Sequence, residues 1–196
     1  MQSPARAWVL PDEPAPVRLM NTIWADASGV HDHLQSPADV AAWFDAVGID
    51  RLGAVATPAD LTRARALRDA ARRLAAYVSG DSREAAVCAT ESIHVALAAV
   101  NAAVLERPAP QLELRDGHLQ STARARVSPV RAGIAQVAEG TVELLCGSTA
   151  DSLRACHAPG CVLYFVKTHP RREWCSVACG NRARAARHYE KVRSAR

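Results

Sequence analysis

The segment Cys156–Cys179, CHAPGCVLYFVKTHPRREWCSVAC, holds four of the six cysteines of this 196-residue chain. Four residues separate Cys156 from Cys161, and three separate Cys175 from Cys179. The two pairs lie thirteen residues apart, which is the spacing of a structural zinc site. We therefore predict one Zn²⁺ held by four thiolates. Such a site leaves no open position for a catalytic water molecule.

Other interpretations of the cysteines stay open. His157 or His169 is close enough along the chain to replace one thiolate. The four cysteines could also be small buried residues without a metal. Cys88 and Cys146 stand alone in apolar helical patterns, where we expect core thiols.

The segment around the cysteines predicts a short, treble-clef-like zinc finger over residues 153–196. The turn at 158–160 should bring the first cysteine pair together, and residues 162–174 should form a hairpin that turns at 168–170. Ser176 can cap a helix that carries the second pair on one face of its first turn. A segment of this size normally needs a metal or a crosslink to fold.

Charge is divided unevenly along the chain. Residues 1–153 contain 14 arginines and 18 acidic residues, whereas residues 154–196 contain ten basic and two acidic residues. The last helix should point an exposed basic stripe away from its cysteines, as a nucleic-acid groove would require. Arg182, near the cysteine side, should pack or pair inside the module rather than contact bases. The predicted DNA-binding residues are Asn181, Arg184, Arg187, His188 and Lys191 on the helix, with Lys167, Arg171 and Arg172 at the hairpin turn. The alternative is a solvated basic surface.

Residues 1–150 predict a mainly α-helical body with one small β-hairpin. Aromatic residues make up only 5% of the chain, which argues against an all-β sandwich. Serine or threonine followed by proline marks three helix starts, and Asp81 suggests a fourth. Helices are expected over 36–48, 57–80, 81–104 and 128–147, and a hairpin over 111–120. Residues 17–23 could be a strand or a helical turn.

Polar residues gather near the N-terminal side of the body, and we consider that they line a small-molecule pocket. The candidate pocket residues are Asn21, Thr22, Trp24, His31 and Asp32. The alternative is that the first two cap a turn and the others belong to a surface loop.

The segment Trp174–Arg182 contains Cys-Gly-Asn-Arg, and together with Cys156 and Cys161 it resembles the CGNR zinc finger. Proteins with this finger carry an N-terminal ABATE domain, whose beginning is similar to 19–22, Trp43 and Gly48 here. The resemblance implies a bacterial, stress-related transcription regulator that binds zinc and DNA. It also implies that the zinc ligands are the four cysteines of the quoted segment.

The leading hypothesis is therefore a zinc-dependent, DNA-binding transcription regulator whose body senses a small-molecule effector or forms a homodimer. The alternative is a zinc-stabilised module that binds protein or RNA, and thiolate oxidation could add a redox switch. We find no nucleophile–base spacing, phosphate loop or paired carboxylates, and so expect no enzyme. With no secretory signal and no apolar run of about 18 residues, we expect a cytoplasmic, nucleoid-associated protein without membrane contact.

Overall fold

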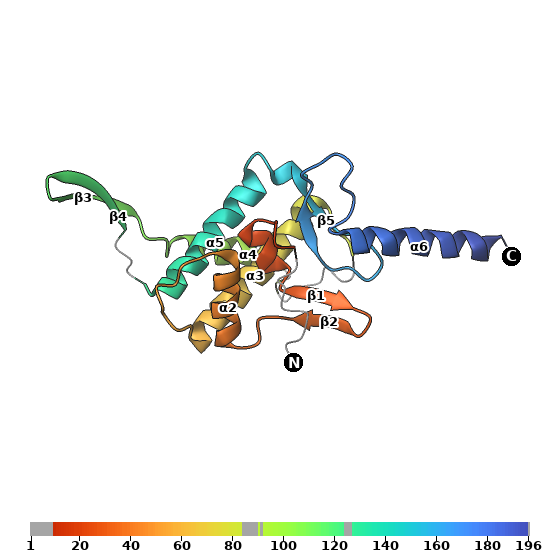
Figure 1. Cartoon of the computed structure of the whole chain (residues 1–196), viewed down its shortest axis with the longest axis horizontal. Helices are drawn as coiled ribbons and strands as arrows, with labels where there is room; N and C mark the ends of the chain where they lie inside the picture. Colours follow the sequence, from red (N-terminus) through yellow and green to blue (C-terminus); the bar gives the residue numbers. More distant parts are fainter. Residues whose placement is uncertain (1–9, 84–89, 91, 124–126, 196) are drawn as a thin grey trace.

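The structure, a computed structural model, describes residues 10–83, 90, 92–123 and 127–195. Five helices and two hairpins form a body, and a C-terminal module follows it (Figure 1). The body contains α1 (Ala15–Met20), β1 (Ile23–Asp26), β2 (Gly29–Asp32), α2 (Pro37–Val47), α3 (Pro58–Ser79), α4 (Ile93–Val104), β3 (Pro110–Arg115), β4 (His118–Ala123) and α5 (Pro129–Cys146). The module contains β5 (Leu153–Ala155), β6 (Tyr164–Val166) and α6 (Val177–Ser194), after the 3₁₀ turn Ala150–Ser152. No helix in these ranges is both long and apolar enough to cross a membrane.

Three helices of the body begin at the predicted capping sequences. Thr57 accepts a hydrogen bond from the Asp60 amide (3.2 Å), and the Asp60 carboxylate accepts one from the Thr57 amide (2.9 Å). Asp39 accepts a bond from the Ser36 amide in the same way at the start of α2, and Ser128 caps α5. These reciprocal bonds satisfy amides that a helix leaves unpaired at its first turn. The helices predicted over 36–48, 57–80 and 128–147 are therefore confirmed.

Of the helix predicted over 81–104, the part from Ile93 is confirmed, and residues 81–83, 90 and 92 are not helical. Its described part, α4, begins at Ile93, with Ser92 as the N-cap. The Asp81 carboxylate accepts bonds from the Arg83 amide and from the Tyr164 hydroxyl. Residues 84–89 and 91 lie outside the described residues. The open question over residues 17–23 is resolved in favour of the short helix α1, followed by the first residue of β1.

The predicted hairpin is present as β3 and β4, which turn at Asp116 and Gly117, both with positive φ. Two further antiparallel pairs, β1–β2 and β5–β6, were not predicted. The β5–β6 pair corrects the hairpin expected over 162–174. β6 pairs with the strand before the first cysteines, and no strand returns through Trp174.

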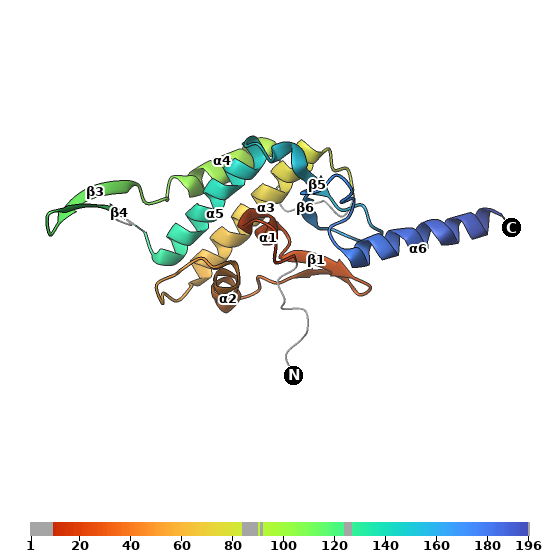
Figure 2. The ribbon, with the colours of Figure 1, turned by 45° about the horizontal axis from the view of Figure 1, so that its top comes forward.

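The core of the body lies between α2, α3, α4 and α5, where side chains such as Trp43, Phe44 and Leu67 are buried. Gly133 on α5 allows close packing, because a Cβ atom there would lie 2.6 Å from the Phe44 ring. The same helices lie side by side in both ribbon views (Figures 1 and 2).

A second buried cluster joins the body to the module. It contains Val17 and Met20 of α1, Ala71 and Ala75 of α3 and Leu144 of α5, together with Leu153, Ala155, Tyr164 and Val166 of the β5–β6 pair. The two sequence segments therefore share part of their core, although they are separate in the chain.

Polar contacts reinforce this joint. The amide of Asn21 donates to the Tyr164 carbonyl (2.9 Å) and accepts from the Tyr164 N–H (2.9 Å). Arg72, almost wholly buried on α3, donates to the carbonyls of Met20 (3.0 Å) and Val162 (3.2 Å). Buried Glu13 accepts from the Val166 N–H (2.9 Å) and thereby ties the N-terminal side of the body to β6.

Replacing Asn21 with alanine should destabilise this joint. The change leaves a buried N–H and a buried C=O of Tyr164 unpaired, so we expect the free energy of unfolding to fall by about 2–4 kcal/mol. Urea denaturation of the zinc-loaded chain measures this loss. Ser148→Ala, at an exposed site after α5, is the control and should change stability by less than about 0.5 kcal/mol. Equal stability of the two variants would contradict the assignment.

Candidate metal centre and basic helix

The four cysteines of the module converge on one point. Their sulfur atoms all lie within 4.8 Å of one another, and all four residues are buried. The Sγ atom of Cys175 lies 3.8 Å from the Sγ atom of Cys161 and 3.4 Å from that of Cys179. Zinc–sulfur bonds of about 2.3 Å at tetrahedral corners place sulfur atoms about 3.8 Å apart. The donors therefore fit one zinc ion, and the module forms a single zinc site.

Two local structures deliver the cysteine pairs. Residues 156–161 form a tight turn, the zinc knuckle, closed by a bond from the Cys161 N–H to the Ala158 carbonyl (2.9 Å). Gly160 takes a φ of 71° that suits glycine. At the second pair, Ser176 caps α6 and accepts from the Cys179 N–H (3.2 Å). The second pair thus lies at the positive end of a helix, which favours thiolates.

Proton sharing among the thiols shows why a cation suits this site. Without a metal ion, the hydrogen bond with Cys161 lowers the pKa of Cys156 to about 2. The same bond raises the pKa of Cys161 to about 12, and hydrogen bonding to Cys156 also raises the pKa of Cys175. One anion is thus stabilised by protons on its neighbours. Four thiolates can replace this arrangement only when a cation balances their charge.

The glycine and the arginine of the Cys-Gly-Asn-Arg motif each have a structural explanation. A Cβ atom at Gly180 would lie 3.0 Å from the Trp174 ring, so glycine lets the indole pack against the start of α6. Arg182 is exposed but donates from Nη2 to the Cys179 Sγ (3.1 Å), which agrees with the prediction that it pairs within the module. A charged donor of this kind stabilises a thiolate.

The alternative ligands are not part of the cluster. His157 and His169 are both exposed, and the Nδ1 atom of His169 accepts a bond from the Arg171 N–H (3.1 Å). Among the described residues, the metal-ligand group consists of the four cysteines alone. Cys146 is exposed, so its predicted place in the core is wrong. Cys88 lies outside the described residues.

The predicted stripe lies on an exposed helix. Asn181, Arg184, Arg187, His188 and Lys191 are all exposed. Only the first turns of α6 contact the module, through residues such as Ala183, and the rest projects away from the body (Figures 1 and 2). Two predicted base-reading residues are already in contact, because Arg184 donates to the Asn181 side-chain oxygen (2.5 Å).

The three residues expected at the turn after β6 differ in their surroundings. Arg171 is exposed and Lys167 is half-buried. Arg172, in contrast, is engaged inside the protein. Its guanidinium donates to the carbonyls of Val166 and Cys175 and forms an ion pair with Glu13 (2.6 Å). We therefore assign Arg172 to the joint between the body and the module rather than to phosphate binding.

The five residues considered for an N-terminal pocket lie at or beside the β1–β2 hairpin, where Arg68 of α3 contacts both Thr22 and Asp32. Asn21 and Thr22 are buried, and the hydroxyl of Thr22 donates to the Leu19 carbonyl (2.8 Å). Trp24 stacks on His31 across the β1–β2 hairpin, with ring centroids 4.5 Å apart. Asp32 instead forms an ion pair with Arg68 of α3 (2.6 Å).

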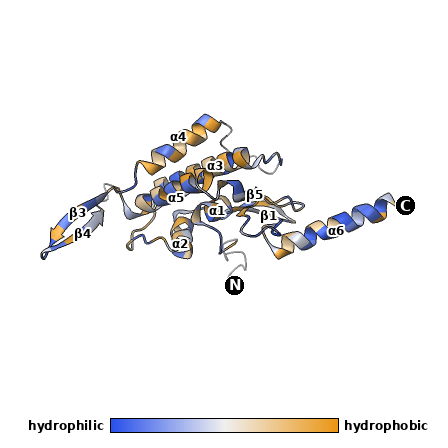
Figure 3. Cartoon of the chain, turned by 90° about the horizontal axis from the view of Figure 1, so that it is seen from above, coloured by the Kyte–Doolittle hydropathy of each residue, from blue (hydrophilic) through white to orange (hydrophobic). Residues whose placement is uncertain are grey.

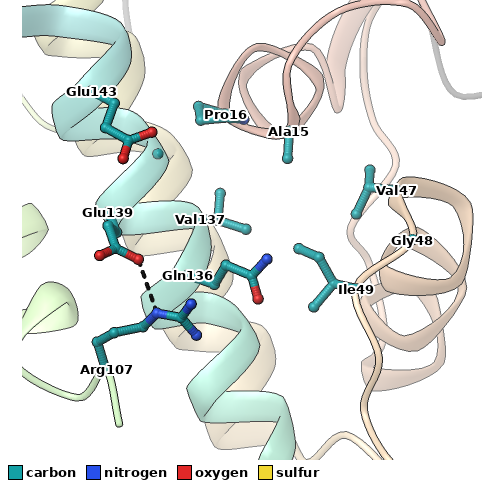
Figure 4. A pocket seen from close by; sticks show the side chains of 11 residues that line it. Ala15, Pro16, Val47, Gly48, Ile49, Arg107, Gln136, Val137, Glu139 and Glu143 are labelled. Atoms are coloured by element: carbon teal, nitrogen blue, oxygen red, sulfur yellow. Dashed lines mark hydrogen bonds and ion pairs between the residues drawn. The ribbon is translucent and has the colours of Figure 1, made fainter. Parts of the chain in front are cut away.

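A different part of the body has a pocket. It has a volume of about 320 Å³ and lies between α1, the end of α2 and α5. Pro16, Ile49 and Val137 form apolar walls, and an ion pair between Arg107 and Glu139 lies at its side (Figure 4). None of the five predicted residues lines this pocket.

Sequence reasoning missed the residues that hold the module in place. It did not single out Arg83, Arg72 or Glu13, and it assigned Asn21 to a pocket instead. Each of these four residues bonds to a partner at least 73 residues away in the chain. The one available signal was the presence of polar residues in otherwise apolar segments, which does not identify a partner.

Removal of one ligand should abolish zinc binding. Cys179→Ser leaves three thiolates at a buried site, so we expect the purified variant to lose its equivalent of zinc and the module to unfold. Cys146→Ser, at an exposed thiol outside the cluster, is the control and should keep one zinc per chain. Elemental analysis with a thiol titration measures both. A Cys179→Ser protein with full zinc content would contradict the site.

Comparison with known families agrees with this division. Residues 13–148 match the ABATE family, described as "Putative stress-induced transcription regulator", and residues 152–192 match the CGNR zinc finger. None of the curated proteins searched matches the chain. The first match covers well over half of the sequence and the second covers the zinc module. The chain therefore belongs to the ABATE family and carries a CGNR zinc finger after its ABATE domain.

Proposed function

We propose that the protein is a DNA-binding transcription regulator in which α6 enters a groove of the DNA and zinc holds that helix in place. The observation that carries the proposal is an 18-residue basic helix that projects from a metal-stabilised module with almost no protein to pack against. On this proposal the protein is a binding protein rather than an enzyme, and it acts in the cytoplasm at the nucleoid.

The composition of α6 supports a polyanionic partner. It contains Arg182, Arg184, Arg187, Lys191 and Arg193 against the single acid Glu190. Most of these side chains are exposed, and Figure 3 shows hydrophilic residues along most of the helix. Arg187 and Lys191 lie one turn apart, where like charges destabilise an isolated helix by a few tenths of a kcal/mol. Phosphate groups would remove this repulsion.

The dimensions of the helix also suit DNA. At 1.5 Å per residue, α6 is about 27 Å long, and the major groove of B-DNA is about 12 Å wide and accepts one helix. Asn181 and Arg184 lie near its start, where they could contact bases, whereas Lys191 and Arg193 lie farther along and suit phosphates. Arg187 stacks over Trp174, with its Cζ atom 5.8 Å from the ring, which holds its charge near the module.

Substitutions on α6 should weaken DNA binding in two distinguishable ways. Arg184→Ala should cost about 1–3 kcal/mol and reduce sequence preference, whereas Lys191→Ala should lower the salt slope by about one unit. Fluorescence anisotropy on sequences selected from genomic DNA, at several salt concentrations, measures both effects. Arg51→Ala removes an arginine of the body between α2 and α3, where it pairs with Asp45, and should change neither.

The same experiment separates the alternatives. If single-stranded RNA of equal length binds more tightly than duplex DNA, the partner is RNA. If neither nucleic acid binds and zinc content is normal, the basic helix instead serves an acidic protein. Both results would reject the DNA proposal.

We further propose that the body forms a homodimer through α4 and the β3–β4 hairpin. One helix reads few base pairs, and two copies would supply two half-sites. The residues of α4, Ile93–Val104, include no charged side chain, and only Ala96 and Val100 are buried. On the projecting hairpin, Leu112, Leu114 and Leu119 are 70–76% exposed, and Leu114 pairs directly with Leu119. The exposed side of α4 and the leucine-bearing face of the hairpin can each pack against the same element of a second copy.

The double substitution Leu112→Ser and Leu114→Ser should therefore produce a monomer, because it removes two apolar side chains from the proposed contact. Sedimentation velocity of the zinc-loaded protein measures the oligomeric state. Leu52→Ser, at an isolated exposed leucine between α2 and α3, is the control and should leave the dimer intact. A monomeric wild-type chain at micromolar concentration would reject this part of the proposal.

For an effector, the pocket beside α5 is a better candidate than Asn21 and its neighbours, whose polar groups are already bonded.

A further inference from the structure

The ABATE domain reaches the zinc site directly through Arg83. One nitrogen of its guanidinium, Nη1, donates to the backbone carbonyls of Cys156 (2.7 Å) and Cys161 (2.9 Å). These are the two ligands of the zinc knuckle. Arg83 comes just after α3, at least 73 residues earlier in the chain, and its side chain is 13% exposed.

The rest of the guanidinium is fixed by Asp81. Nε and Nη2 donate to the two carboxylate oxygens of Asp81, at 2.8 Å and 2.7 Å. The Asp81 carboxylate is completely buried and also accepts the hydroxyl of Tyr164 (2.8 Å). Burial raises the pKa of Tyr164, so its phenol stays protonated and remains a donor. Arg83 is thus held in one orientation by partners on both sides of the joint.

This geometry constrains the metal ligands. The Cys156 and Cys161 carbonyls lie at the two ends of the knuckle, and a single nitrogen that bonds both limits how far those ends can separate. The sulfur atoms are attached to the same two residues, so their separation is limited as well. Arg83 and Asp81 together are neutral, and the effect of Arg83 on zinc is therefore mainly one of geometry. Arg182, which donates directly to the Cys179 sulfur, supplies charge from the other side.

We infer that Arg83 is a positioning residue of the zinc site and that the CGNR finger retains zinc fully only when the ABATE domain supplies this side chain. Residues that orient metal ligands typically contribute 10- to 100-fold to metal affinity. By linkage, zinc must stabilise the Arg83 segment of the ABATE domain to the same extent. The inference concerns the metal site and does not depend on DNA binding.

The test is the rate at which the zinc-loaded full-length chain transfers its metal to an excess of a chromogenic chelator. Arg83→Met removes every donor but keeps an unbranched side chain of similar reach. We expect it to release zinc about 10- to 100-fold faster than wild type. Arg83→Lys keeps the charge but cannot bond two carbonyls and a carboxylate together, so it should also release zinc faster.

Two controls separate positioning from general loss of stability. Arg51→Met removes a similar arginine, which pairs with Asp45 and donates to the Ala54 carbonyl far from the module, and should match wild type within about twofold. Asn21→Ala weakens the joint without touching a ligand carbonyl. We expect Arg83→Met to release zinc faster than Asn21→Ala even if both lose equal stability.

Release from both Arg83 variants at the wild-type rate would overturn the inference. So would release rates that follow only the free energy of unfolding across all four variants. If Arg83→Met does not fold, Arg83→Lys and Tyr164→Phe, which removes only the hydroxyl on Asp81, give the same comparison. Wild-type release from both of these would equally reject the role.

Discussion

The convergence of four thiolates on one cation is the constraint on which the C-terminal module depends. Its two strands have three residues each, and its helix projects into solvent. Such a small module has too little apolar surface to offset the entropy of ordering its own chain. The metal supplies part of the missing free energy, and the knuckle and the cap of α6 are the local structures that place sulfur atoms around it.

The ABATE domain supplies the other part of that free energy. The ABATE match ends at residue 148 and the zinc-finger match begins at residue 152. Leu153 and Tyr164 of the finger nevertheless pack with α1 and α3 of the ABATE domain in one buried cluster. The side-chain amide of Asn21 takes the place of a neighbouring strand at the edge of β6, because it bonds both the N–H and the C=O of Tyr164. The finger is therefore a separate unit in the sequence but not in the packing of the protein.

The features that could be predicted from the sequence are those whose physical cause is local. Thr57 and Asp60 cap a helix from within the same four residues, Asp116-Gly117 turns a hairpin by its own φ angles, and the cysteine spacing predicts the metal-ligand group. The β5–β6 pair was not predicted because three-residue strands show no clear alternation of polar and apolar side chains. The roles of Arg83 and Arg172 depend on partners far away in the chain, and arginine in a basic segment gives no sign of a buried carbonyl or carboxylate partner.

This dependence on distant partners has a consequence for how α6 is oriented. The helix is fixed to the module at Cys179 and Ala183, the module is fixed to β5 and β6, and those strands are fixed to α1 and α3 of the ABATE domain. The link from α5 is short, with only the turn Ala150–Ser152 before β5. The direction in which the basic residues point is therefore determined by the packing of the ABATE domain. A change in that packing would reorient α6 without any change in the helix itself.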